Sequence, residues 1–179
     1  IFLYGRKMLF QMLEILYPRR CAVCDEIEVT GKGICPLCKD KVHVAGEPAC
    51  KKCGKPLVDE RKEFCTDCGK KHHVYTQGKA VFVYEGGIRN SMYRFKYGNK
   101  REYAEFYANA AVEKYGVWLN KIKAEVLIPI PMYSRKKRLR GYNQAEVFAR
   151  ELGRKAGILV DEHLVRRVRN TIPQKELNE

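Results

Sequence analysis

Residues 21–38 read C-A-V-C-D-E-I-E-V-T-G-K-G-I-C-P-L-C, and residues 50–68 read C-K-K-C-G-K-P-L-V-D-E-R-K-E-F-C-T-D-C. All eight cysteines of the chain lie in these two stretches, and each belongs to a C-x-x-C pair. A C-x-x-C turn places two thiolates on one side of an ion, and tetrahedral Zn²⁺ takes four ligands of this kind. Because protein ligands fill all four positions, we expect structural rather than catalytic metal. The sequence therefore predicts two Zn²⁺ sites, whose ligands are Cys21, Cys24, Cys35, Cys38, Cys50, Cys53, Cys65 and Cys68.

Two ways of grouping the four pairs are open. Sequential grouping gives a tandem zinc ribbon, whereas interleaved grouping gives a cross-braced module. The gaps between successive pairs are 10, 11 and 11 residues, about a hairpin's length, which favours sequential grouping. Disulfides are a weaker interpretation, because disulfide frameworks rarely place every cysteine in a C-x-x-C pair. Iron is a further alternative. Gly54 and Gly69 each directly follow a predicted ligand, and tight turns that bind zinc or iron both use a glycine there. A colourless protein would exclude iron.

Charge and composition divide the chain. It has 179 residues, with 35 Lys and Arg against 21 Asp and Glu, and a formal net charge of +14. Apolar residues make up 45 %, too many for a disordered chain, and no apolar run reaches the roughly 20 residues of a membrane span. Residues 79–179 contain no cysteine but carry 21 of the basic residues and 11 of the acidic ones. We therefore expect a helix over 1–18, a double zinc ribbon over 19–75, and a basic second domain over 76–179 with an anionic partner.

Apolar periodicity predicts an α/β arrangement in the second domain. We expect a strand over 80–84, helices over 88–95 and 101–120, a buried strand over 125–130, and a short strand over 158–160. A further helix is expected to begin at Asn143, because Asn143 and Glu146 have the spacing of a capping box.

A basic run, R-K-K-R-L-R over residues 135–140, lies between the predicted buried strand and this helix, where we expect a loop. A helix N-terminus offers unpaired N–H groups and partial positive charge. Ligands of open α/β sheets bind where strands end. The sequence therefore predicts a phosphate or pyrophosphate site formed by Arg138, Arg140, Gly141, Asn143 and Gln144. The alternative is a solvated basic loop that binds nothing.

Four stretches carry further motifs: L-Y-P-R-R-C-A-V-C at 16–24, F-K-Y-G at 95–98, I-P-I-P followed by R-G-Y-N-Q-A within 128–145, and R-x-T-x-x-Q-x-x-L at 169–177. In this order they resemble the ComF-type family of competence-associated proteins. The resemblance implies a type I phosphoribosyltransferase-like domain after the double zinc ribbon, with pyrophosphate bound between Arg138 and Gln144. It also implies a mobile catalytic loop that contains Arg169, Thr171 and Gln174.

The same resemblance implies a function in DNA uptake during natural transformation. It implies a cytoplasmic protein that binds single-stranded DNA and phosphoribosyl pyrophosphate or a similar ligand, with a helicase as partner. The family's acidic pair and T-T-G-A-T loop, which hold the ribose phosphate and Mg²⁺, have no counterpart here. We therefore expect a fragment that does not catalyse phosphoribosyl transfer by itself, with Mg²⁺ only in an active intact protein and no catalytic residue assigned. The alternatives are a non-catalytic zinc-ribbon adaptor for nucleic acid or protein, and a nucleotide-salvage phosphoribosyltransferase.

Overall fold

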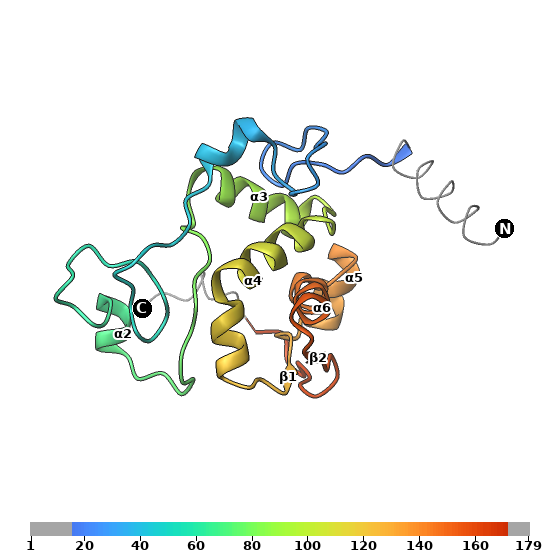
Figure 1. Ribbon diagram of the computed structural model, residues 1–179. Coiled ribbons are helices and arrows are strands. Elements are labelled where there is room, and N and C mark those ends of the chain that lie inside the picture. Colours follow the sequence, from blue (N-terminus) through green and yellow to red (C-terminus); the bar gives the residue numbers. More distant parts are fainter. Residues whose placement is uncertain (1–15, 172–179) are drawn as a thin grey trace. The chain divides into compact units, whose positions relative to one another are not determined.

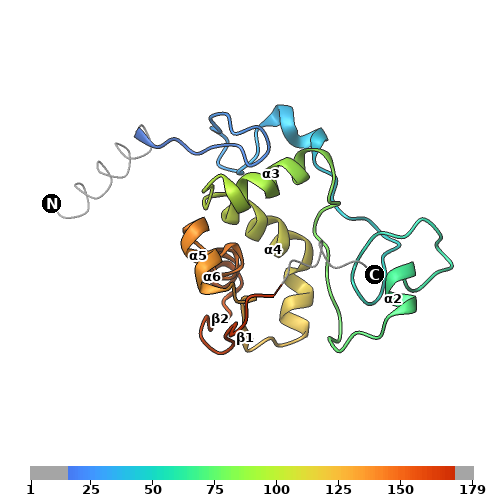
Figure 2. The same ribbon diagram turned by 180° about the vertical axis from the view of Figure 1, so that it is seen from behind.

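The computed structural model describes residues 16–171, and these divide into two compact units between Met92 and Tyr93. Figures 1 and 2 show the chain from opposite sides. Most of the helix expected over 1–18 lies outside the described residues. Between residues 16 and 171, no helix is long and apolar enough to cross a membrane. The domain boundary expected at residue 76 stays a prediction.

The first unit is built from short loops around its cysteines. Its small helical elements are the 3₁₀ helix η1 (Pro36–Lys41) and helix α2 (Thr66–Lys70). Each follows a cysteine with extended backbone, Cys35 (φ −74°, ψ 157°) before η1 and Cys65 (φ −69°, ψ 164°) before α2. The second C-x-x-C pair of each stretch therefore enters a helical turn, in which residues three apart lie on one side.

The strand predicted over 80–84 is wrong in extent. A single isolated bridge joins Val44 to Phe82, with one backbone hydrogen bond on either side of it. Helix α3 (Gly86–Tyr97) then begins two residues before its predicted start. Gly86 has a φ of 46°, a left-handed conformation that turns the chain at the start of α3. The predicted helix itself is confirmed, and it ends at Tyr97, two residues after its predicted end.

The second unit packs two helices beside a small parallel sheet (Figure 1). Helix α4 (Tyr103–Lys121) lies against helix α6 (Gln144–Ala156). Strand β1 (Val126–Leu127) pairs in parallel with β2 (Leu159–Val160), Val126 opposite Leu159. The predicted 3.6-residue periodicity of α4 is confirmed by its buried residues, which are Tyr103, Ala104, Phe106, Tyr107, Ala108 and Ala111.

The long buried strand predicted over 125–130 is wrong. Only Val126 and Leu127 are paired, and the next two isoleucines, Ile128 and Ile130, are exposed, Ile130 to 75 %. Proline has no N–H for a ladder, so Pro129 and Pro131 end the pairing after two residues. The short strand predicted at 158–160 is confirmed as β2.

The loop predicted over the basic run 135–140 is also wrong, because these residues form helix α5 (Ser134–Arg140). Lys, Arg and Leu are good helix formers, and the run contains no glycine or proline. Gly141 ends α5 in the left-handed conformation (φ 83°), and its N–H donates to the Lys137 carbonyl at 2.8 Å. The anion site predicted here thus lies between two helices rather than in a loop between a strand and a helix.

The predicted fold class is supported for its zinc-ribbon part. The second unit, by contrast, is mainly helical and has one two-stranded sheet among its described residues. Its type I phosphoribosyltransferase-like fold stays a prediction.

Candidate metal centres and anion site

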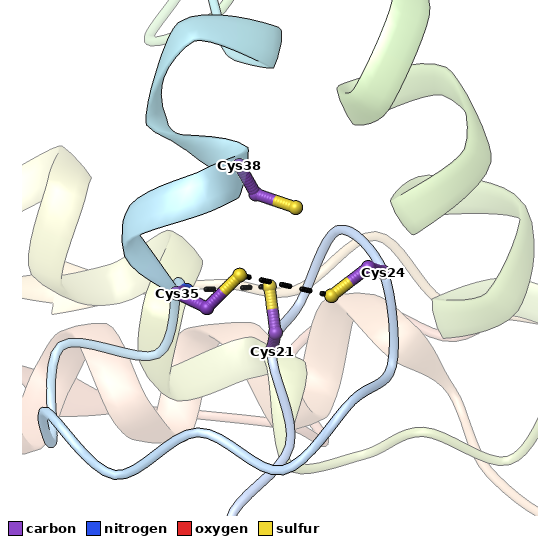
Figure 3. Close-up of side chains that lie close together, drawn as sticks. All are labelled: Cys21, Cys24, Cys35 and Cys38. Carbon is purple, nitrogen blue, oxygen red and sulfur yellow. Dashed lines mark hydrogen bonds between the residues drawn. The ribbon is translucent and has the colours of Figure 1, made fainter.

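The eight cysteines form two groups of four, Cys21, Cys24, Cys35 and Cys38 in one and Cys50, Cys53, Cys65 and Cys68 in the other. Within each group the sulfur atoms all lie within 4.8 Å of one another. Figure 3 shows the first group with its thiols turned toward a common centre. The grouping is the sequential one, not the interleaved one.

The sulfur spacing suits tetrahedral Zn²⁺. The Sγ atoms of Cys24 and Cys35 lie 3.8 Å apart, and those of Cys53 and Cys65 also lie 3.8 Å apart. Four sulfurs at about 2.3 Å from Zn²⁺ form a tetrahedron with an edge of about 3.8 Å. All eight cysteines are free rather than joined in disulfides. The donor set and its geometry therefore fit two structural Zn²⁺ ions.

The two metal centres are a structural repeat. The first C-x-x-C pair of each centre lies in a tight turn, which we call the first knuckle (residues 19–28) and the second knuckle (residues 48–57), 29 positions apart. Each backbone hydrogen bond of the first knuckle has its equivalent in the second. Cys21 N donates to Glu26 O as Cys50 N donates to Lys55 O, both at 2.8 Å. Asp25 N donates to Cys21 O (2.9 Å) as Gly54 N donates to Cys50 O (2.8 Å). Glu28 N donates to Arg19 O (2.8 Å) as Leu57 N donates to Pro48 O (2.7 Å).

Backbone N–H groups stabilise one thiolate in each centre. Burial disfavours the thiolate of Cys21, but hydrogen bonds from backbone N–H groups outweigh it and lower the pKa to about 7. Two of these donors, the N–H groups of Val23 and Cys35, lie 3.4 Å from the Cys21 sulfur. The same holds for Cys50: burial raises its pKa, but backbone hydrogen bonds outweigh burial and lower the pKa to about 6. These two cysteines are therefore ready to bind a metal near neutral pH.

The last cysteine of each centre behaves in the opposite way. Burial, followed by hydrogen bonds with neighbouring cysteines, raises the pKa of both Cys38 and Cys68 to about 12. Ligands must be deprotonated to bind Zn²⁺, so metal uptake releases protons from these two thiols.

Glu28 supports the first centre, a role that the sequence pattern did not predict. Its carboxylate is buried and accepts hydrogen bonds from the backbone N–H groups of Thr30 (2.5 Å) and Gly33 (3.1 Å). Burial raises the pKa of Glu28, but these donors and the Thr30 hydroxyl outweigh it, and the pKa lies below its ordinary value. The carboxylate thus fixes the loop that leads to Cys35. The sequence feature that could have indicated this role is the position of Glu28, two residues before the T-G-K-G turn at 30–33.

Tyr75 lies beside the second centre, and this too was not predicted. Burial and then the charge of Cys68 raise the pKa of the Tyr75 hydroxyl. The Tyr75 ring stacks on His73 (5.1 Å between centroids), and the Lys52 ammonium lies 5.1 Å from its centroid. His73, Tyr75 and Lys52 therefore form a small cluster around the Tyr75 ring.

Helix α3 begins against the first centre. A Cβ on Gly87 would lie 2.7 Å from Val23 Cγ1 and 2.8 Å from the Lys41 carbonyl oxygen, so only glycine allows this approach. Beside it lies a cavity of about 660 Å³. His43 Nδ1 lies 2.9 Å from the Glu85 carboxylate at this cavity. The cavity lining is Val23, Cys24, Cys38, Lys41, His43, Glu85, Gly86, Gly87 and Asn90.

The structure brings together four of the five residues predicted to bind an anion. Arg140 Nη1 donates to Gln144 Oε1 at 2.5 Å, across the turn that contains Gly141. Asn143 is buried and caps α6, because its Oδ1 accepts from Ala145 N at 3.0 Å. Arg138 is exposed, and no interaction joins it to this turn within the described part of the chain.

The other polar atoms of Asn143 hold the turn in place. Its Nδ2 donates to the Ile130 carbonyl at 3.0 Å and to Glu146 Oε1 at 3.3 Å. In a capping box the donor to Glu146 would be the backbone N–H of Asn143, but here the donor is the side-chain Nδ2 of Asn143. Glu146 also pairs with Lys137 at 2.6 Å. The predicted cap is therefore confirmed, and the side chain of Asn143 shapes the site.

The residues predicted for a mobile loop lie apart from regular structure. Arg169 and Thr171 are exposed, and the Thr171 hydroxyl accepts a hydrogen bond from Arg167. Gln174 lies outside the described residues. Their assignment to a catalytic loop stays a prediction.

Comparison with known families gives a match to the double zinc ribbon domain over residues 12–69. Comparisons with curated proteins and with solved structures give no significant match. The matched residues include all eight cysteines. The N-terminal part of the chain is thus similar to a double zinc ribbon, and its two four-cysteine centres suit two structural Zn²⁺ ions.

Proposed function

We propose that this is a ComF-like, zinc-binding protein whose second domain is phosphoribosyltransferase-like and binds a phosphorylated ligand and single-stranded DNA during DNA uptake. The order of the sequence motifs supports this proposal, together with one structural feature. That feature is the junction between α5 and α6, where Gly141 (φ 83°) reverses the chain before the N-terminus of α6.

The chemistry of this junction favours an anion. Helix α5 has five basic residues and no acidic one, and α6 presents the N–H groups of its first turn. Arg140 is held by Gln144 at 2.5 Å, so its guanidinium is oriented before a ligand arrives. The acidic group in the first turn, Glu146, is compensated by Lys137 at 2.6 Å.

The zinc ribbons contribute structure and an interaction surface. Their match suggests nucleic-acid or protein binding, and closed four-cysteine sites leave the metal no position for a substrate. The same proposal includes the domain limits 19–75 and 76–179, a helicase partner, and Mg²⁺ in an active transferase. It also includes a mobile catalytic loop with Arg169, Thr171 and Gln174.

Calorimetric titration with phosphoribosyl pyrophosphate tests the anion site. The variant Arg138→Ala with Arg140→Ala should bind at least about tenfold more weakly, since charge-assisted hydrogen bonds are among the strong ones. The control is Arg135→Ala with Lys136→Ala, which removes the same charge from the same helix. Equal reductions in both variants would indicate a general charge effect, and unchanged affinity in the first would refute the site.

A further inference from the structure

Two exposed tyrosines lie next to the proposed anion site. Tyr93 and Tyr97 are one turn apart on α3, with side chains 65 % and 63 % exposed. Their rings lie 5.1 Å apart between centroids and are tilted by 48°. Large aromatic side chains this exposed and this close together form a surface on which planar groups can stack.

Arg140 joins this aromatic pair to the anion site. Its guanidinium carbon lies 4.8 Å from the centroid of Tyr97, while its Nη1 donates to Gln144 at 2.5 Å. One cation therefore borders both an exposed aromatic face and the N-terminus of α6. A ligand that reaches both must carry negative charge and flat apolar groups along its length.

The end of α3 is held rigidly for such a ligand. The buried Tyr142 donates its hydroxyl proton to the Phe95 carbonyl, and burial raises the pKa of Tyr142, which keeps this proton in place. The Arg101 guanidinium lies 4.9 Å from the centroid of the Tyr142 ring and donates to the Gly141 carbonyl at 3.1 Å. These interactions fix the end of α3 to the turn before α6, so little backbone freedom is lost on binding.

The surrounding charge selects the ligand. Residues 93–101 and 134–140 contain nine basic residues and no acidic one. An apolar protein surface does not complement this positive charge, whereas a nucleic-acid backbone offers one negatively charged phosphate per nucleotide. In a duplex the base faces are covered by stacking, and only a single strand exposes them to aromatic side chains.

We propose that Tyr93, Tyr97 and Arg140 form a stacking platform for the bases of single-stranded nucleic acid, with phosphates bound by the neighbouring basic residues. This inference rests on the proposed function, because it specifies how the strand is held beside the anion site. Base–aromatic stacking is independent of sequence, so the platform accepts strands of any composition.

Fluorescence anisotropy with the full zinc-loaded chain tests the platform. The probes are labelled oligothymidylate of about 15 nucleotides and an abasic oligomer of equal length, matched in charge but without bases. Tyr93→Ala with Tyr97→Ala should weaken oligothymidylate binding about tenfold or more and leave abasic binding unchanged, since only the bases stack on the rings. Tyr93→Phe with Tyr97→Phe should bind like the wild type. Tyr84→Ala, which removes an exposed tyrosine of the first unit, is the control.

The outcomes separate the platform from the proposed function. If the alanine variant binds oligothymidylate as the wild type does, the platform is refuted and nucleic-acid binding stands. An equal reduction on both probes would show that the tyrosines only support the structure, which also refutes the platform. A wild type that binds neither probe would refute nucleic-acid binding and the platform together. Circular dichroism melting of each variant establishes that it is folded.

Discussion

Asp25 and Gly54 occupy the same position in the two knuckles, and both have left-handed backbone, with φ of 69° and 75°. Each donates its N–H to the carbonyl of the first cysteine of its centre, Cys21 or Cys50. The turn requires this conformation whichever residue stands there, and glycine adopts it at least cost.

The first prediction concerns this position in the first knuckle. Asp25→Gly and Asp25→Ala both remove the carboxylate, but only alanine keeps a Cβ at a φ of 69°. The free energy of unfolding should therefore be about 1–2 kcal/mol higher for Asp25→Gly than for Asp25→Ala. Urea unfolding of the zinc-loaded protein measures the difference. Equal stability of the two variants would show that backbone strain at Asp25 is unimportant.

The equivalent change in the second knuckle should be worse. A Cβ on Gly54 would lie 2.7 Å from Ala80 N and 3.0 Å from Lys79 Cα, and backbone atoms cannot move aside cheaply. Gly54→Ala should thus destabilise by the left-handed strain of about 1–2 kcal/mol and by a steric clash in addition. The same urea experiment measures it, and a destabilisation no larger than the difference between Asp25→Gly and Asp25→Ala would contradict the close approach of residues 78–80.

The buried carboxylate of Glu28 predicts a pH-dependent contribution to stability. Its pKa is lower in the folded chain than in the unfolded one, so the folded state binds the proton more weakly. Its contribution is therefore complete above the unfolded pKa, about 4.3, and is lost as the pH falls through the lowered folded value. Glu28→Gln should cost about 1.5–3 kcal/mol at pH 7, because charged acceptors are replaced by a weaker one.

Chemical unfolding at several pH values measures the Glu28 effect. The difference between wild type and Glu28→Gln should be largest at pH 7 and shrink as the pH falls below about 4. Glu60→Gln, at an exposed position, should match the wild type throughout. A difference that does not change with pH would mean that the carboxylate's charge is not what holds the loop.

Zinc stoichiometry should distinguish the two groupings of the cysteines. Wild type should bind two Zn²⁺ and be colourless, because d¹⁰ zinc has no visible absorption, unlike iron. Cys21→Ser with Cys35→Ser should lose one ion, since both ligands belong to one centre, whereas Cys21→Ser with Cys50→Ser should lose both. Elemental analysis of the purified proteins gives the counts. The reverse result would establish the interleaved arrangement.

Binding of single-stranded DNA should depend steeply on salt. The logarithm of the association constant should fall with the logarithm of salt concentration by about 0.7 for each phosphate neutralised. Arg138→Ala with Arg140→Ala should therefore reduce the slope by about 0.7 for each phosphate that the variant no longer neutralises. Anisotropy titrations at several salt concentrations provide the slopes. A flat response in the wild type would show that the protein does not bind the strand mainly through its phosphates.

Local sequence predicts the metal centres well because a knuckle is a local structure. The C-x-x-C spacing and the short gaps determine which thiols can meet, and the structure groups them sequentially. The cap at Asn143 was predictable for the same reason, since its partner Ala145 is two residues away.

Features that depend on distant residues were not predictable. The length of β1 depends on a partner 33 residues away, Leu159 opposite Val126, so its apolar sequence overstated the strand. The charge of the basic run 135–140 suggests a loop, although its helix propensity and the stop at Gly141 decide its structure. Arg140 and Tyr97 are far apart in the sequence, and no local pattern indicates that they meet.

The repeat of the two knuckles has an electrostatic consequence. Residues 21–28 (C-A-V-C-D-E-I-E) contain three acidic residues and no basic one, whereas residues 50–57 (C-K-K-C-G-K-P-L) contain three basic residues and no acidic one. The backbone hydrogen bonds are equivalent, so the side chains between the cysteines are free to differ. One turn geometry thus carries side chains of opposite charge: with Arg19 and Arg20 included the first knuckle has a formal side-chain charge of 2 − 3 = −1, and the second has +3, so an approaching polyanion is attracted more strongly by the second. The double ribbon is close to neutral as a whole yet strongly polar from one knuckle to the other.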